Sequence, residues 1–156
     1  MNPKYLTTDA QLQSFAERAA TAEWLALDTE FVRENTYYPI LCLAQMATAE
    51  EIVLLDLLTI NDFAPLAALL QSGPVKIMHA PGQDLEAFAT VDIRGIRPLF
   101  DTQQAQALLG GKPQVGYAGL VAERLSVDLA KDQTRTDWSR RPLSEAQQRY
   151  AADDVR

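Results

Sequence analysis

The sequence predicts a single α/β domain with a mixed five-stranded sheet flanked by helices. Two observations carry this prediction: three strand-like segments follow one another closely within residues 24–56, and helices then alternate with short apolar strands up to residue 101. Closely spaced strands favour a meander, whereas strand–helix alternation favours parallel crossovers, so we expect a mixed sheet. At 156 residues the chain is too short for an eightfold β/α barrel, and no glycine-rich phosphate loop follows the first strand.

The first part of the chain predicts one helix and three strands. Thr8-Asp9 is a typical cap for a helix over residues 10–20. Apolar side chains lie on one face of this helix: Leu12, Phe15, Ala16 and Ala19. Strands are expected next over residues 24–31, 40–47 and 51–56.

The middle of the chain predicts a helix, a strand and a second helix. Residues 63–71 form the first helix, which Ser72-Gly73-Pro74 stops. Residues 75–79 read as a short buried strand, followed by a turn at residues 80–82 and a helix over residues 84–90.

The last third predicts one more strand and three helices. The strand covers residues 98–101, and Asp101-Thr102 caps a helix that ends before Gly110-Gly111. Further helices are expected over residues 115–125 and from residues 142–145 to the end, with a polar stretch at residues 131–141 between them.

The composition is that of an ordinary globular protein. Hydrophobic residues make up 47% and charged residues 22% of the chain. No apolar run approaches the roughly 20 residues that span a bilayer, and the N-terminus lacks the layout of a signal peptide. The one cysteine, Cys42, lies in an apolar run and is expected to be buried rather than catalytic. A chain without a possible internal disulfide is expected in a reducing cytoplasm.

The net charge of −7 argues by itself against a partner held by bulk charge, because nucleic-acid-binding proteins usually carry a basic face. Two interpretations remain open at this point. Either nucleic acid is not the partner, or some of the acids are clustered to hold metal ions that invert the local charge.

Asp28 and Glu30 are the first candidate site residues. They stand at positions i and i+2 of the strand over residues 24–31, so both carboxylates point to one face. The alternative is that both acids face solvent on an edge strand and have no functional role. The apolar run before them favours a central strand, whose end is a usual place for a site in α/β sheets.

Two later segments add candidate residues. Asp84 opens a helix after the strand that ends at His79, where an aspartate more commonly serves the helix cap or dipole. His79 itself is expected to be a hydrogen-bonded structural residue rather than a metal ligand. Tyr150 and Asp154 lie at i and i+4 of the last helix and therefore on one face, although a core tyrosine with solvated acids is the simpler alternative.

These three segments, in this order, resemble the motifs of the tyrosine-bearing DEDD 3′–5′ exonucleases: Asp28-x-Glu30, His79-x4-Asp84-Leu85 and Tyr150-x3-Asp154. Within that superfamily the amino-acid sequence is similar to the ribonuclease D family over nearly the whole chain. The similar stretches are residues 27–33, 36–39, 84–86, 101–103, 135–138 and 141–143. The resemblance implies a ribonuclease H-like fold.

The resemblance also implies an activity: removal of nucleotides one at a time from RNA 3′ ends, such as those of tRNA precursors, to give nucleoside 5′-monophosphates. It implies Asp28, Glu30, Asp84 and Asp154 as ligands of two divalent ions, and Tyr150 as the catalytic tyrosine. Four carboxylates in one pocket repel each other by about 4 kcal/mol per close pair, so they need protons or cations. Oxygen ligands favour Mg²⁺ or Mn²⁺. Tyr150 is expected to orient the attacking water, since a tyrosine with a pKa near 10 is a poor base.

Several side chains are candidates for holding the substrate. Phe31 is a candidate for stacking on the terminal base, and Gln45 for a sugar contact, with core packing and a buried hydrogen bond as the alternatives. Candidates for phosphate contacts are Arg33, Lys131, Arg135, Arg140, Arg141 and Arg149, of which we favour Arg135, Arg140 and Arg141. Scattered surface charge is the alternative for each of them.

Two rival functions remain: a DNA-directed exonuclease of the same superfamily, and a non-catalytic nucleic-acid-binding module. The complete set of four acids and Tyr150 argues against the second. Residues 1–156 are expected to be the N-terminal exonuclease domain of a longer, monomeric protein with helical nucleic-acid-binding domains downstream. The last turn of the final helix is therefore expected to fray.

Overall fold

The computed structural model describes residues 1–34, 36–129 and 136–156. Its centre is one six-stranded sheet in the order β1-β4-β3-β2-β5-β6. The strands are β1 (Lys4–Leu6), β2 (Trp24–Val32), β3 (Ile40–Ala47), β4 (Ile52–Asp56), β5 (Val75–Met78) and β6 (Leu99–Asp101). The β3 strand is antiparallel to β2 and β4, and the other pairs are parallel. The mixed α/β sheet is confirmed, but it has six strands rather than five.

The additional strand is β1, which pairs in parallel with β4. It has only three residues, of which only Leu6 is buried, so the sequence gives it no alternating pattern. Its place in the sheet comes from tertiary contacts: the Tyr5 hydroxyl donates to Asp56 Oδ2 at the end of β4, at 2.5 Å.

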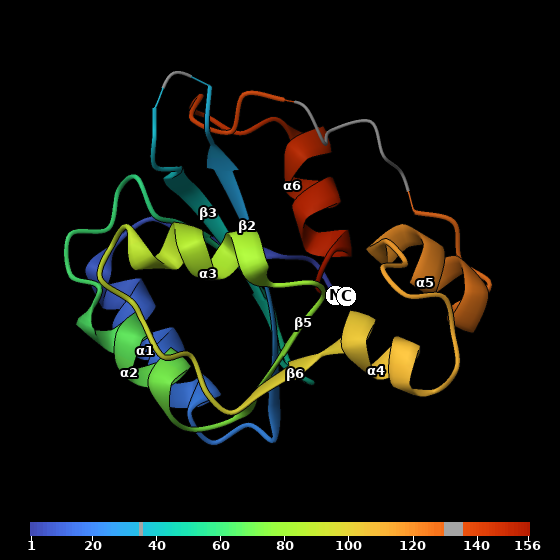
Figure 1. The fold of residues 1–156 in the computed structure, drawn as a ribbon. Helices are drawn as coiled ribbons and strands as arrows, with labels where there is room; N and C mark the ends of the chain where they lie inside the picture. The colour runs from blue at the N-terminus through green and yellow to red at the C-terminus, as the bar shows by residue number, and fades with distance from the viewer. Residues whose placement is uncertain (35, 130–135) are drawn as a thin grey trace.

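Six helices accompany the sheet in the part of the chain that the structure describes, and Figure 1 shows their arrangement. They are α1 (Asp9–Ala19), α2 (Ala64–Gln71), α3 (Gly82–Ala89), α4 (Thr102–Leu108), α5 (Tyr117–Leu125) and α6 (Glu145–Asp153). The predicted helices are all present, with shifts of one to three residues at most ends. Capping boxes fix two of the starts, at Thr8 for α1 and at Ser144 for α6.

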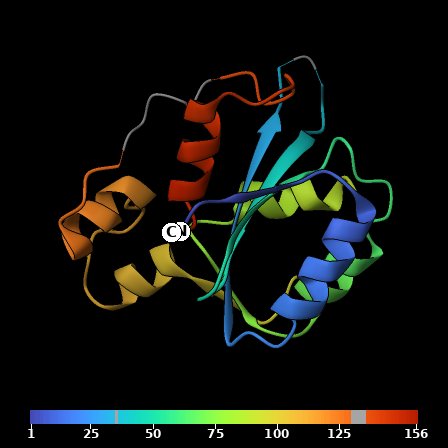
Figure 2. The ribbon, with the colours of Figure 1, turned by 180° about the vertical axis from the view of Figure 1, so that it is seen from behind.

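The helices cover the two faces of the sheet unequally. Helices α1, α2 and α3 bury the larger core, with Phe15, Leu66 and Phe88 against the sheet. Helix α6 covers the other face, where Ala151 packs with Leu43. Helices α4 and α5 stand beside the β6 edge, as seen from the front and from behind (Figures 1 and 2). On this face Ala152 of α6 packs with Ala47 of β3 and Ile52 of β4.

Two further observations concern the cysteine and the length of the helices. Cys42 has no exposed surface, as predicted for a structural cysteine. No helix in the described ranges is both long and apolar enough to cross a membrane.

Candidate active site

The candidate site lies on the second half of β2, on the face of the sheet that α6 covers. Because side chains alternate along a strand, β2 presents Asp28 and Glu30 to the α6 face and turns Thr29 toward α3. Asp154 follows the last turn of α6 and meets the two strand acids. One carboxylate oxygen from each of Asp28, Glu30 and Asp154 lies within 4.8 Å of the others. Three carboxylates from two distant parts of the chain therefore form one acidic cluster.

The acidic cluster has an unfavourable electrostatic environment without a cation. Burial raises the pKa of Asp28 well above its ordinary value, and the charges of Asp84 and Asp154 raise it further. Burial and, after it, the charge of Asp28 raise the pKa of Glu30 to about 9. The pKa of Asp154 rises to about 7 through burial and the neighbouring Asp153. A site that favours protonated carboxyls at neutral pH is one that divalent cations can occupy in place of protons.

Asp84 lies close to the acidic cluster but is not part of it. Its Oδ1 accepts a 2.5 Å hydrogen bond from the Thr29 hydroxyl on the α3 side of β2. Burial raises the pKa of the Asp84 carboxyl. Its charge acts on both Asp28 and Glu30, so the four acids interact even though only three are grouped.

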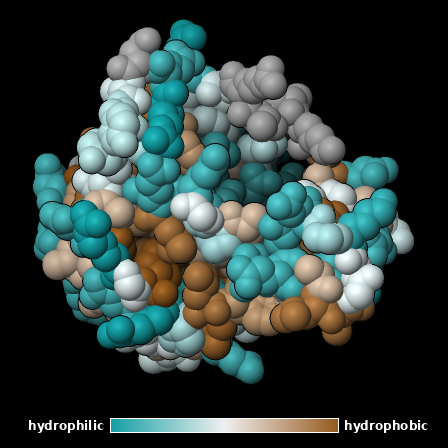
Figure 3. Space-filling view, in the orientation of Figure 1, coloured by the Kyte–Doolittle hydropathy of each residue, from teal (hydrophilic) through white to brown (hydrophobic). Residues whose placement is uncertain are grey.

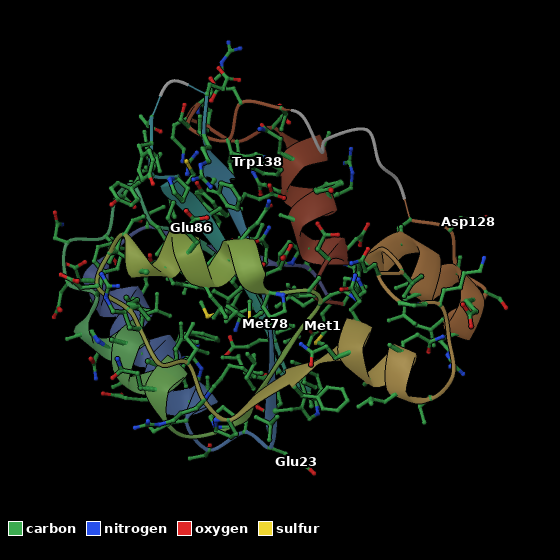
Figure 4. The ribbon with its side chains drawn as sticks, viewed as in Figure 1. Met1, Glu23, Met78, Glu86, Asp128 and Trp138 are labelled. Carbon is green, nitrogen blue, oxygen red and sulfur yellow. The ribbon has the colours of Figure 1, made fainter. Side chains whose placement is uncertain are left out.

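Tyr150 stands one turn before Asp154 on α6. Its ring centroid lies 6.1 Å from that of Trp138, and the backbone N–H of Asp154 donates to the Tyr150 carbonyl at 3.3 Å. Figure 4 shows Trp138 between β2 and the start of α6. Trp138 is buried among Cys42, Leu43 and Ala151, so it fixes the segment before α6 onto the sheet. The contact between the two rings places Trp138 beside the candidate site.

Two hollows meet at the acidic cluster, and both are lined by Asp28, Glu30 and His79. The first, which we call the acidic groove, has a volume of about 1030 Å³ and is lined by residues 28–34, by residues of α3 and the turn before it, and by residues 136–138. The second, which we call the apolar cavity, has a volume of about 590 Å³. It extends between β5, α4 and α5, and Tyr150 and Asp154 lie on its wall. In Figure 3 the surface is recessed between α3 and α5, with hydrophilic residues on the rim.

His79 is held by two hydrogen bonds at the junction of the hollows. Its Nδ1 lies 2.9 Å from Thr102 Oγ1, and its Nε2 lies 2.8 Å from the Val115 carbonyl. The Tyr117 ring packs edge-on against it at 5.7 Å. Both ring nitrogens thus have partners in the protein, which agrees with the structural role predicted for His79.

The candidate substrate residues differ in what the structure allows them to do. Phe31 packs partly on the larger core and also lines the acidic groove. Gln45 is fully buried opposite Asp28, and its amide atoms have no hydrogen-bond partner among the described residues. It lines neither hollow, so a direct sugar contact would require its side chain to move.

Arg141 requires a correction. Its Nε donates to Asp56 Oδ2 at 2.5 Å and its Nη2 to Asp56 Oδ1 at 2.7 Å, in a bidentate ion pair with a buried carboxylate. The remaining donors reach backbone carbonyls, including that of Cys42 at 3.0 Å. The guanidinium is therefore occupied by protein acceptors and does not extend to a substrate phosphate.

The other basic candidates lie at the surface or outside the described residues. Arg140 is exposed, Arg149 is 3.7 Å from Glu145, and Arg33 pairs with Glu86 at 2.9 Å. Lys131 and Arg135 lie outside the described residues. The sequence missed the Arg33–Glu86 pair, because it joins the residue after β2 to α3 across 53 positions.

The comparisons with known proteins agree with this geometry. Residues 3–156 match a family described as 3′–5′ exonuclease. Ribonuclease D of Pseudomonas paraeruginosa is 45% identical over 153 residues, which are 97% of this chain and 41% of that protein. Ribonuclease D of Escherichia coli is 44% identical over 156 residues, which are 99% of this chain and 42% of that protein. The resemblance to the ribonuclease D family is thereby confirmed.

Solved structures give the same answer for the fold. The crystal structure of E. coli RNase D, described as an exoribonuclease involved in structured RNA processing, superimposes with a TM-score of 0.96 over 99% of this chain and 42% of that one, at 44% identity. Brucella melitensis NrnC with bound Mg²⁺ has the same fold at 24% identity, with a TM-score of 0.75 over 98% of this chain and 72% of that one. The chain spans about two fifths of the length of its ribonuclease D relatives.

Proposed function

The chain belongs to the 3′–5′ exonuclease family, and from this membership we propose that it hydrolyses RNA from the 3′ end and releases nucleoside 5′-monophosphates. The observation that carries the proposal is the acidic cluster of Asp28, Glu30 and Asp154 within 4.8 Å. Such a set of oxygen ligands suits a divalent cation and has little structural use without one.

We propose that Asp28, Glu30 and Asp154 hold the cations and that Asp84 completes the site from α3. The donor set is made entirely of carboxylate oxygens, which favours Mg²⁺ or Mn²⁺ over Zn²⁺. Two bound ions would supply an activated water and neutralise the charge that develops on the phosphate. Thr29 holds the Asp84 carboxylate through its hydroxyl, so it fixes the acid beside the site before any cation arrives.

Tyr150 is the proposed group that orients the attacking water. It lines the apolar cavity together with Asp28 and Asp154, and the packing of its ring beside Trp138 restricts where its hydroxyl points. A hydroxyl held in this way can donate to, or accept from, a water during attack without giving up its own proton. Phe31 and Arg140 are the substrate contacts that we retain, for the terminal base and an upstream phosphate respectively.

The finer features of the proposal are the substrate, the assembly and the domain plan. We propose that residues 1–156 are the exonuclease domain of a monomeric cytoplasmic enzyme that trims structured RNA 3′ ends, including those of tRNA precursors. Its single buried cysteine suits a reducing compartment. The similarity to ribonuclease D supports RNA rather than DNA as the substrate.

A digestion assay tests the proposal. Single-stranded RNA and DNA of identical sequence, labelled at the 5′ end, are incubated with the protein in Mg²⁺, Mn²⁺ or EDTA, and the products are separated by length and identified by chromatography. We expect a metal-dependent ladder and 5′-mononucleotides from RNA, and no activity for Asp28→Asn. Preference for DNA would indicate the DNA-directed alternative. If no nucleotides are released from either substrate, the non-catalytic nucleic-acid-binding module becomes the better interpretation.

A further inference from the structure

Two neighbouring tyrosines lie exposed at the end of the β2–β3 hairpin. Tyr37 is 81% and Tyr38 is 64% exposed, and their rings meet edge-on with centroids 4.9 Å apart. Two large aromatic side chains that face solvent side by side offer apolar surface on which a ligand can stack.

The backbone under these rings is held in place. Thr36 Oγ1 donates to the Tyr38 carbonyl at 2.6 Å, and Arg33 Nη2 donates to the Tyr37 carbonyl at 3.0 Å. The same guanidinium binds both carboxylate oxygens of Glu86 on α3, at 2.9 and 3.1 Å. Figure 4 shows Glu86 on the α3 ribbon below the hairpin. A ring pair on a fixed backbone loses little conformational entropy when a ligand stacks on it.

The acidic groove leads from the acidic cluster toward this hairpin. Arg33 and Glu34 line its outer part, directly before the hairpin turn. Leu43 of β3 pairs with Glu30, and Tyr38 precedes Leu43 by five residues, which limits the distance between the Tyr38 and Leu43 Cα atoms to roughly 17 Å. A nucleic-acid strand whose 3′ end reaches the cluster and whose 5′ side leaves along the groove past Arg33 would run toward the hairpin.

We propose that Tyr37 and Tyr38 form a stacking surface for unpaired RNA bases upstream of the 3′-terminal nucleotide, which rests on the proposed exonuclease function. Stacking on an aromatic ring tolerates every base, as an enzyme that advances along arbitrary sequence requires. The segment that carries exposed Arg140 is attached to the same hairpin, since Arg141 Nη2 donates to the Cys42 carbonyl on β3 at 3.0 Å. Arg140 can therefore meet a phosphate beside a stacked base.

The experiment measures how the two rings affect substrates of different length. Oligoadenylates of 2, 4, 8 and 12 nucleotides are digested in Mg²⁺ by the wild type, by the double variant Tyr37→Ala/Tyr38→Ala and by Tyr37→Phe/Tyr38→Phe. Leu108→Ala is the matched control, since Leu108 is 88% exposed on α4, away from the hairpin (Figure 1). Fluorescence anisotropy of a labelled 12-mer in Ca²⁺ gives Kd independently of hydrolysis.

We expect the double alanine variant to raise KM for the 8- and 12-mers and Kd for the 12-mer by about tenfold, with kcat and the KM of the dinucleotide unchanged. The phenylalanine variant and Leu108→Ala should match the wild type. An equal rise for the dinucleotide, or an unchanged Kd for the 12-mer, overturns the proposal. If the wild type releases no mononucleotides, the proposed function fails, while the Kd measurement still decides this inference.

A second copy of the chain is the other occupant that such a surface could hold. Light scattering during size-exclusion chromatography distinguishes the two. A concentration-dependent dimer of the wild type that is lost in the double alanine variant would assign the tyrosines to self-association and overturn the RNA proposal, whereas a monomer at all concentrations supports it.

Discussion

Tyr150 offers a test of the chemistry at a single atom, because phenylalanine keeps the ring and removes only the hydroxyl. The ring packs 6.1 Å from Trp138, and this contact survives Tyr150→Phe. If the hydroxyl orients the attacking water, kcat should fall by roughly a hundredfold while KM for RNA stays within about twofold. Steady-state kinetics on a short RNA, with the exposed α4 variant Leu108→Ala as a control, measures the split. A matching rise in KM would instead assign the hydroxyl to substrate binding.

Arg140 and Arg141 are adjacent but should behave oppositely when truncated. Arg141→Ala leaves the Asp56 carboxylate, which is 2% exposed, without its main partner, so we expect a loss of about 3–5 kcal/mol of stability. The Arg141 guanidinium lowers the pKa of Asp56 despite burial, so the part of its stability that depends on ionisation is lost as pH falls through the acidic range. Arg140→Ala should leave Tm within about 2 °C and raise KM for RNA a few-fold. Thermal unfolding and kinetics on both variants decide between these roles.

The sequence predicted which acids lie together better than it predicted the contacts around them. The spacing of Asp28 and Glu30 on a strand fixes them on one face, and the motif order places Asp154 with them, as the structure bears out. That Asp84 is held by Thr29 depends on how α3 packs against β2, which no local pattern encodes. The ion pair of Arg141 likewise depends on Asp56, which lies 85 positions away in the sequence. An arginine that the sequence suggests is at the surface therefore has a structural role in the fold.

At the scale of elements, helix α2 ends on a buried cation. Lys76 of β5 has no exposed surface, and its Nζ donates to the carbonyls of Ser72 at 2.7 Å and Arg97 at 2.6 Å, with Leu69 at 3.4 Å. Methionine fills a similar volume but leaves these carbonyls without a donor. We therefore expect Lys76→Met to cost about 2–4 kcal/mol in urea unfolding, although burial already lowers the pKa of Lys76. Lys112→Met, at an exposed position, should cost less than about 0.5 kcal/mol.

The sequence predicted some helices and strands better than others, depending on whether their signals are local. Capped and strongly periodic segments such as α1 were found to within one residue, because the cap and the apolar face are local signals. Strand β1 was missed because its three residues are ordered by pairing with β4 rather than by their own pattern. Helix α3 begins two residues earlier than predicted, at Gly82, since the turn residues 80–82 already lead into its first turn.

At the scale of the whole molecule, the acidic cluster joins the first and last parts of the domain. Asp28 and Glu30 belong to the central strand, and Asp154 belongs to the helix that covers it, so the repulsion between them acts across the β2–α6 interface. A cation in the cluster would bind both elements at once. The stability of the domain should therefore depend on pH and on divalent metal together.

The sign of that dependence follows from the raised pKa of Glu30, which is about 9 in the folded protein against 4.5 for an ordinary glutamate. The folded state holds this proton over a range in which the unfolded state has released it, so the stability of the metal-free protein is greatest below about pH 4.5 for this group and falls as pH rises toward 9. In EDTA we expect Tm to drop by at least about 5 °C between pH 6 and pH 9. Mg²⁺ or Mn²⁺ should remove most of the drop, because the cations replace protons in the folded state alone.

Scanning calorimetry of the wild type, Glu30→Gln and the exposed control Glu50→Gln tests this prediction. Glu30→Gln should flatten the dependence of Tm on pH and lose the rise of Tm with metal, whereas Glu50→Gln should keep both. A metal response that survives in Glu30→Gln would place the cations elsewhere.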